Sequence, residues 1–197
     1  MKKILFGTIA VAAGLLGQSV GAQEVTLKFH HIWNPQAMAA VNVIAPWCEK
    51  VAKESSNRLK CQILPAMSGG GTPAQLVDRI KDGVDDVTIT LPGYTAGRFP
   101  STEVFELPFM TNSAEAGARA TWDYMNKYSL KEFPGTKLLA TWVHDEGYVH
   151  TTSKPIHTLA DFKGLKVRAP TRQTNKLLAA LGANPVGMTL QAVLDAV

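Results

Sequence analysis

The chain has 197 residues, of which 46% are hydrophobic and 18% are charged, and its formal net charge is +4. These values are those of an ordinary globular protein with one or two domains. Lysines and arginines do not cluster on one element, and aromatic residues do not interleave with them, so the composition argues against nucleic-acid binding.

The first 22 residues have the pattern of a secretory signal peptide. Lys2 and Lys3 precede a short apolar run over 4–16, and the small residues at 20–22 offer a cleavage site before Gln23. The apolar run is shorter than the roughly 20 residues that span a bilayer, which favours a cleaved signal over a membrane anchor. We therefore expect an exported chain, with 18 basic and 16 acidic residues left after cleavage.

Strands alternate with helices in the first half of the chain. Hydrophobic periodicity predicts strands over 24–32, 58–64 and 85–91, and helices over 34–56 and 74–83. Pro46 lies inside the first of these helices and removes a backbone donor, so we expect a kink or a restart there. Thr72 followed by Pro73 predicts the N-cap and the first residue of the second helix.

The same alternation continues in the second half and indicates an α/β fold built from βα units. Helices are predicted over 114–128, 171–182 and 189–197, and strands over 137–143 and 184–188, with a further short apolar strand around Arg168. Asn112, with Glu115 three residues later, indicates the start of the first helix, and Thr171 and Gly182 indicate the limits of the second. Residues 165–197 begin a second unit with too few strands to close a core. We therefore expect a fragment of a longer protein or a segment that docks on an absent partner.

Cys48 and Cys61 are the two cysteines of the sequence, and an even pair in an exported protein indicates a disulfide. Cys48 lies about eight residues before the end of its predicted helix. Cys61 lies about three residues into the next predicted strand, which runs back along that helix, so the two can be level. A bridge would add roughly 3 kcal/mol of stability in the chain-entropy model. Two buried thiols are the alternative.

Arg168 occupies the carboxyl end of a predicted strand, just before the helix that Thr171 caps. Ligands of open α/β sheets bind beyond these strand ends, and a helix N-terminus favours an anion. The guanidinium fork also matches both oxygens of a carboxylate, although Arg168 and Lys166 could instead share a solvated face. Aromatic or polar residues follow other strands, where packing explains each one as well as ligand contact does: Trp33, Tyr94, Trp142, His144 and His150.

Catalytic, metal and phosphate sites have little support in the sequence. There is no His-Glu-x-x-His motif and no Cys–His pairing at a familiar catalytic spacing. The glycine-rich stretch at 68–73 lacks the Gly-Lys-Ser/Thr ending of a phosphate loop, and His30 and His31 would point to opposite faces of their strand. We therefore expect a protein that is not an enzyme and has no catalytic residues, metal or cofactor.

Two long stretches resemble one known family, the TRAP-transporter solute-binding proteins of the dicarboxylate type (DctP). The stretch 154–188 contains Lys-Pro-Ile, then Asp-Phe-Lys-Gly-Leu-Lys-Val-Arg and a proline, and then Ala-Leu-Gly-Ala-Asn-Pro-Val. The stretch 82–110, DGVDDVTITLPGYTAGRFPSTEVFELPFM, is similar to the family's segment before its third helix. The similarity is collinear from Val25 to the last residue.

The resemblance implies a periplasmic-binding-protein-like (type II) α/β fold in which two lobes close over an organic acid by hinge motion. Members have roughly 300 residues in two lobes, so this chain is expected to be truncated. It would comprise a signal peptide (1–22), the first lobe (23–144), and the hinge with the start of the second lobe (145–197). The expected partners are a small organic acid and the membrane subunits of a TRAP transporter in the periplasm, with no nucleic acid. A sensory module of the same fold is the alternative, followed by an enzyme acting on a small organic acid.

The resemblance also assigns roles to residues. The family's Lys-(Ile/Val)-Arg arginine, which pairs with the substrate carboxylate, is Arg168 here, while Thr171 matches a donor to the substrate and Leu190 a residue that covers it. Val149 stands where many members carry a second arginine, which favours a monocarboxylate with an apolar or aromatic body. His150 could add a pH-dependent donor. The expected ligand-binding residues are therefore Arg168, Thr171, Trp33, Tyr94, His150 and Leu190.

Overall fold

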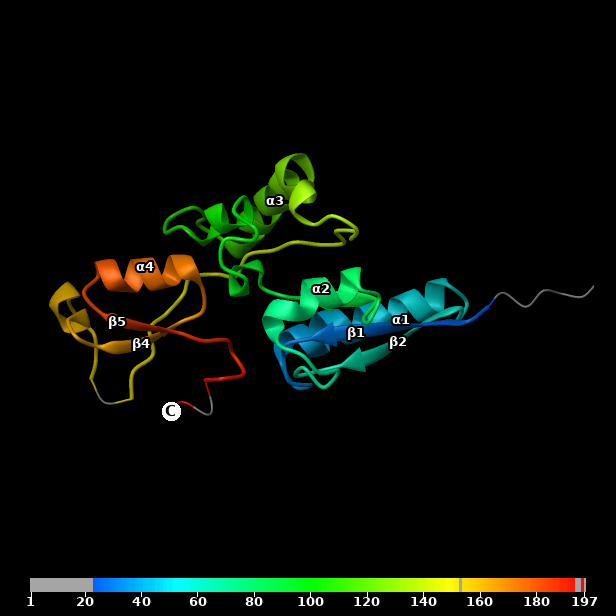
Figure 1. Ribbon diagram of the computed structural model, residues 1–197, viewed down its shortest axis with the longest axis horizontal. Helices are drawn as coiled ribbons and strands as arrows, with labels where there is room; N and C mark the ends of the chain where they lie inside the picture. Colours follow the sequence, from blue (N-terminus) through cyan, green and yellow to red (C-terminus); the bar gives the residue numbers. More distant parts are fainter. Residues whose placement is uncertain (1–22, 153, 194–195, 197) are drawn as a thin grey trace, which may run out of the picture.

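The computed structural model describes residues 23–152, 154–193 and 196, so the predicted signal peptide lies outside the described residues. Two groups of strands lie toward opposite ends of the molecule, with α3 between them (Figure 1). The strands are β1 (Val25–His31), β2 (Leu59–Leu64), β3 (Val87–Ile89), β4 (Lys166–Ala169) and β5 (Asn184–Gly187). The α-helices are α1 (Ala45–Glu54), α2 (Leu76–Lys81), α3 (Ala114–Tyr124) and α4 (Arg172–Ala180). Short 3₁₀-helices are η2 (Pro73–Gln75), η3 (Pro92–Tyr94), η4 (Thr102–Glu106), η6 (Leu130–Glu132) and η7 (Leu159–Phe162), and π-helical turns are η1 (Ala40–Ile44) and η5 (Met125–Ser129).

The first sheet has the order β2-β1-β3, and both strand pairs are parallel. Phe29, in the central strand, lies opposite Ile63 on one side and Val87 on the other. Its ring is 3% exposed and meets the ring of Trp47 edge-on, with 5.5 Å between centroids. Burying a side chain of this kind stabilises the fold by about 1.5–3 kcal/mol. Phe29 therefore anchors the core between the first sheet and α1.

The predicted disulfide between Cys48 and Cys61 is confirmed. The two Cα atoms are 5.7 Å apart, and the bond joins α1 to β2. Cys48 belongs to the core that surrounds Phe29, and Cys61 packs against it. The covalent link therefore fastens an edge strand of the first sheet to the helix that covers it.

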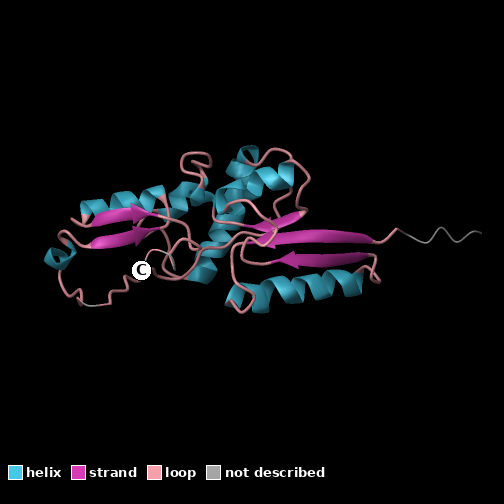
Figure 2. Cartoon of the chain, turned by 60° about the horizontal axis from the view of Figure 1, so that its bottom comes forward, coloured by secondary structure: helices cyan, strands magenta, loops and turns pink. Residues whose placement is uncertain are grey.

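The second sheet consists of β4 and β5, which are parallel and pair Arg168 with Val186. Figure 2 shows the two sheets as separate groups of strands lined by helices. A second small core is formed by Ala169, Leu178 and Ala183, packed against Phe162 and Val167. As predicted, Thr171 caps α4, and Gly182 follows the helix with a φ of +90° that favours glycine. The α/β fold class expected from the sequence is confirmed.

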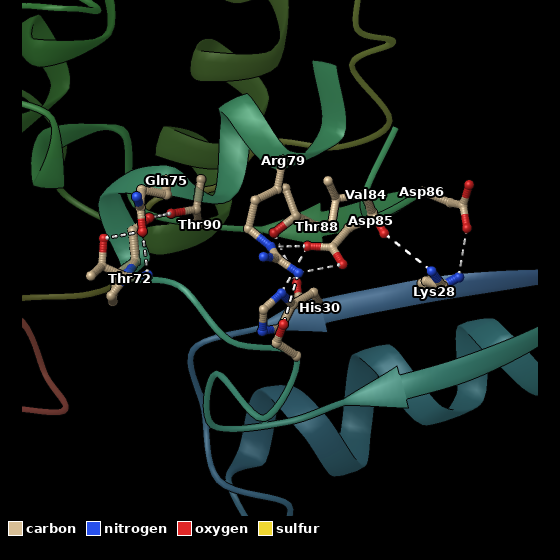
Figure 3. Close-up of polar contacts among 12 residues, drawn as sticks. Lys28, His30, Thr72, Gln75, Arg79, Val84, Asp85, Asp86, Thr88 and Thr90 are labelled. Atoms are coloured by element: carbon tan, nitrogen blue, oxygen red, sulfur yellow. Dashed lines mark hydrogen bonds and ion pairs between the residues drawn. The ribbon is translucent and has the colours of Figure 1, made fainter. Parts of the chain in front are cut away.

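A cluster of buried polar side chains joins α2 to the first sheet (Figure 3). The Asp85 carboxylate accepts hydrogen bonds from Arg79 Nε (2.6 Å), Arg79 Nη2 (3.1 Å) and His30 Nδ1 (2.8 Å). Arg79 Nη2 also donates to the Gly69 carbonyl at 2.9 Å. Burial alone would raise the pKa of Asp85, but the hydrogen bonds from Arg79 and His30 outweigh it and hold this pKa below its ordinary value. The cluster is therefore ionic at neutral pH, with the charge of Asp85 balanced by Arg79.

The ends of the elements differ from the prediction where side chains take other partners. Pro46 does coincide with a change of winding, from π-helical η1 to α1. The predicted N-cap Asn112 was wrong, because Ser113 has the extended backbone of a cap and its hydroxyl accepts from the Ala116 N–H. Glu115 pairs instead with Arg119, one turn along α3.

Two predicted elements do not form within the described residues. The segment 137–143 makes no ladder with another described strand, and Leu139 and Trp142 are about half exposed. Its alternating pattern indicates a propensity for extended backbone, but a strand also requires the edge of a neighbouring strand with which to pair. Residues 191–193 form a turn and 189–190 no helix, and part of that predicted helix, 194–195 and 197, lies outside the described residues. In the part that the structure describes, no helix is long and apolar enough to cross a membrane.

Candidate functional site

Apart from His150, each predicted site residue lies near the carboxyl end of a strand or in the chain that follows it. Trp33 comes after β1, Tyr94 ends η3 after β3, and Leu190 comes after β5. Arg168 is the third residue of β4, and Thr171 opens α4. Because parallel strands collect their carboxyl ends at one edge, each sheet presents its candidate residues on a single side.

Two hydrogen bonds bring the chain after β5 against the end of the first sheet. The backbone N–H of Leu190 donates to the Tyr94 hydroxyl at 3.3 Å. The amide of Gln191 donates from Nε2 to the carbonyl of Ile32, beside Trp33. The structure therefore brings Tyr94 and Leu190 together.

Arg168 is half-buried, and its guanidinium is held on one side by the chain after β5. Nε donates to the carbonyl of Met188 at 3.0 Å. No carboxylate among the described residues forms an ion pair with Arg168. A guanidinium carries five N–H donors, so most of them are left for another acceptor.

Trp33 and His150 occupy different surroundings. Trp33 is half-buried and packs on the core around Phe29, with its ring 6.1 Å from that of His31. His150 is exposed, and none of the described hydrogen bonds joins it to the other predicted site residues. The adjacent histidines considered as metal ligands separate, because His30 binds Asp85 while His31 lies between Phe29 and Trp33. Burial lowers the pKa of His31, so its ring is neutral at pH 7.

Thr171 lies where the second sheet meets η3 and η4. Its side chain is buried, and its hydroxyl accepts from the Thr174 N–H at 3.3 Å. A Cβ placed on Gly93 would lie 2.6 Å from Thr171 Cγ2 and 2.2 Å from Glu106 Oε1. Only glycine lets these three groups approach so closely.

Glu106 was not predicted from the sequence, and its carboxyl group is unusual. Glu106 Oε2 is buried and has no hydrogen-bond partner among the described residues. Burial raises the pKa of Glu106 above its ordinary value, the Thr171 side chain offsets part of this rise, and the charge of Glu103 adds to it. The signal available in the sequence was the spacing of Glu103 and Glu106, which one 3₁₀ turn directs to the same side.

Replacing Glu106 with glutamine should raise the melting temperature at pH 7, by a few degrees for a domain of this size. A carboxyl whose pKa is raised in the fold contributes stability at low pH and loses it as pH rises through the raised pKa. The advantage of Glu106→Gln should therefore shrink as pH falls through the raised pKa toward the ordinary value of 4.5, and it should be absent below that value. Melting curves from pH 4 to 8 measure this. Glu103→Gln is the matched control of opposite sign, since its pKa is lowered, and a Glu106 variant that also destabilises at pH 7 contradicts the expectation.

Two parallel α/β units that meet near their strand ends, with an arginine there that lacks a carboxylate partner among the described residues, fit the class of α/β solute-binding proteins. The sequence matches the family described as bacterial extracellular solute-binding protein, family 7 (DctP), over residues 29–197. The chain therefore belongs to this family of TRAP solute-binding proteins.

Solved structures of relatives agree with this assignment. A TRAP solute-binding protein from Rhodoferax ferrireducens T118, in complex with copurified benzoate, is 55% identical with a TM-score of 0.85, over 87% of this chain and 53% of that chain. A marine-metagenome TRAP solute-binding protein, in complex with 3-hydroxybenzoate, is 46% identical with a TM-score of 0.85, over 88% of this chain and 54% of that chain.

A curated relative matches over a similar share of its length. The 2,3-diketo-L-gulonate-binding periplasmic protein YiaO of Escherichia coli K12 is 28% identical over 145 residues, which is 72% of this chain and 44% of that protein. The chain thus spans about half the length of the curated relatives that it matches.

Proposed function

We propose that a receptor of the relatives' length that contains this chain captures an aromatic monocarboxylate in the periplasm and delivers it to the membrane subunits of a TRAP transporter. Arg168 carries the proposal. It is a half-buried residue near the carboxyl end of the parallel strand β4, and its hydrogen bond among the described residues goes to a backbone carbonyl, that of Met188. A carboxylate can accept two of the remaining N–H groups at once, which fixes the orientation of the acid.

The relatives support the aromatic class of the ligand. The two solved structures at 55% and 46% identity hold benzoate and 3-hydroxybenzoate, which each carry one acid group on an aromatic ring. In this chain Val149 stands where many family members place a second arginine, and one cation suits one carboxylate. Trp33, Tyr94 and Leu190 would supply apolar contacts to a ring, with Thr171 as a hydrogen-bonding group and His150 as a pH-dependent donor.

The division of the chain follows from the same proposal. We assign 1–22 to a cleaved signal peptide, 23–144 to the first lobe, and 145–197 to the hinge and the start of the second lobe. The separate sheets β2-β1-β3 and β4-β5 support this division. Ligand would favour the closed form because the acid contacts both lobes there, whereas the open form offers it only one.

A ligand screen on the full-length receptor tests the function. We expect benzoate and 3-hydroxybenzoate to raise the melting temperature, since a ligand at 100 times its Kd stabilises the folded state by about 2.7 kcal/mol. Succinate, with two carboxylates, and benzamide, which lacks the charge, serve as matched controls and should give no shift. Product analysis by chromatography distinguishes a receptor, which returns the acid unchanged, from an enzyme.

Preference for succinate over benzoate would overturn the ligand class. Turnover of the acid would overturn the receptor role. Isothermal titration of benzoate against the full-length receptor gives the affinity and a stoichiometry expected to be one acid per chain.

A further inference from the structure

Glu103 makes a buried contact between η4 and the first turn of α4. Its side chain is only 5% exposed. Oε1 accepts the Gly97 N–H at 2.9 Å, within the same loop. Oε2 accepts two donors from α4, Arg172 Nη2 and, at 2.8 Å, Gln173 Nε2. One carboxylate thus holds two side chains that follow it by 69 and 70 residues.

The charge state of Glu103 depends on those donors. Burial by itself would raise the pKa of Glu103, but the Arg172 guanidinium, the Gly97 N–H and the Gln173 amide outweigh burial and hold this pKa below its ordinary value. Two charged groups lie near Glu103. Arg172 stabilises its carboxylate, and Glu106 lies one 3₁₀ turn away on the same element. A buried carboxylate that loses such donors is strongly disfavoured, unlike an exposed ion pair.

The donors directly follow the residue that caps α4. Thr171 is the N-cap, and Arg172 and Gln173 are the first two residues of the helix. On its other side, Thr171 packs against Gly93 of η3 in the close contact described above. The first turn of α4 is thus held by η3 and η4 together, and Arg168 lies three residues before the cap in β4.

We propose that Glu103 is a positioning residue for the ligand site, acting through the first turn of α4 on Thr171 and Arg168. This inference rests on the proposed function. Glu103 itself touches no ligand, because its oxygens are already engaged by Gly97, Arg172 and Gln173. It sets the orientation of the α4 N-terminus relative to η3, and so the distance between the guanidinium of Arg168 and the aromatic wall at Tyr94.

Benzoate affinity of the full-length receptor tests the role of Glu103. Glu103→Gln keeps the size of the side chain but removes the charge, and benzoate should bind about tenfold more weakly, within the usual range of coupling between sites. Gln173→Met removes one hydrogen bond and leaves Arg172 in place, so it should fold and weaken binding by about two- to threefold. Asp85→Asn is the control, because it weakens a buried carboxylate–arginine contact that has no part in α4; its benzoate affinity should stay within about twofold.

Two further readouts separate positioning from general destabilisation. If Glu103 acts through Thr171, the combined loss in Glu103→Gln/Thr171→Val should be smaller than the product of the two single losses. Hydrogen exchange without ligand should also be faster at the Thr174 and Asn175 amides in Glu103→Gln, with the exchange of β1 unchanged.

The outcomes distinguish this inference from the function on which it rests. If the wild type binds neither benzoate nor 3-hydroxybenzoate, the proposed function fails and the inference fails with it. If the wild type binds benzoate and Glu103→Gln binds it equally well, or the double variant shows the full product of both losses, the inference alone fails.

Discussion

Replacing Arg168 with alanine in the full-length receptor should abolish micromolar binding of benzoate and change the melting temperature little. The guanidinium lies at the end of β4 and donates to one described acceptor, the Met188 carbonyl. Without this guanidinium, a bound carboxylate loses at least about 1.5–3 kcal/mol of binding free energy, the value of a hydrogen bond to a charged group. That range corresponds to roughly a 10- to 150-fold loss of affinity.

Isothermal titration and a melting curve on the same preparation check both parts of this expectation. Arg168→Lys keeps the charge but loses the fork, so its affinity should fall between those of the wild type and Arg168→Ala. Arg119→Ala is the matched surface control, since Arg119 pairs with Glu115 at an exposed position on α3 and should leave binding unchanged. Unchanged benzoate affinity in Arg168→Ala would refute the carboxylate clamp.

Replacing Asp85 with alanine should destabilise the protein by about 3 kcal/mol, the largest stability effect expected here. The carboxylate is 1% exposed and accepts from both Arg79 and His30. Its loss leaves the Arg79 charge without its partner and the buried His30 ring with neither nitrogen satisfied. Urea denaturation at pH 7 measures the change.

The neighbouring aspartate provides the control for this prediction. Asp86 is exposed and accepts the Lys28 N–H at 2.8 Å, on the other side of the same turn (Figure 3). Asp86→Ala should cost less than about 1 kcal/mol, because water replaces the lost acceptor. Equal losses for the two variants would show that the buried cluster contributes no more than a surface contact.

Local sequence signals predicted most of the elements around the site. β1 and β2 follow alternating apolar residues, of which Phe29 and Cys61 lie in the core or pack against it. The limits of α4 were predicted because Thr171 and Gly182 act through their own backbone neighbours. The disulfide was predicted because the helix and the strand that carry the cysteines are consecutive in the chain.

Contacts between distant parts of the chain were out of reach of the same reasoning. Nothing in the sequence near Glu103 indicates that its partners lie 69 and 70 residues later, or that Glu106 is half-buried beside Thr171. The strand predicted over 137–143 failed for a related reason, since pairing depends on an edge elsewhere in the fold. Motif resemblance supplied the family and the proposed role of Arg168, whereas the elements that hold α4 in place came only from three-dimensional contacts.

The two margins of the first sheet are fastened by different chemistry. β2 is tied to α1 by a covalent sulfur bridge, and β3 is tied to β1 and α2 by the ionic group centred on Asp85. Because the pKa of Asp85 is lowered in the fold, its contribution persists above the ordinary value of 3.8 and disappears as pH falls. A thiol reductant at neutral pH and an acid under oxidising conditions would thus loosen opposite borders of one sheet, each leaving the other border intact.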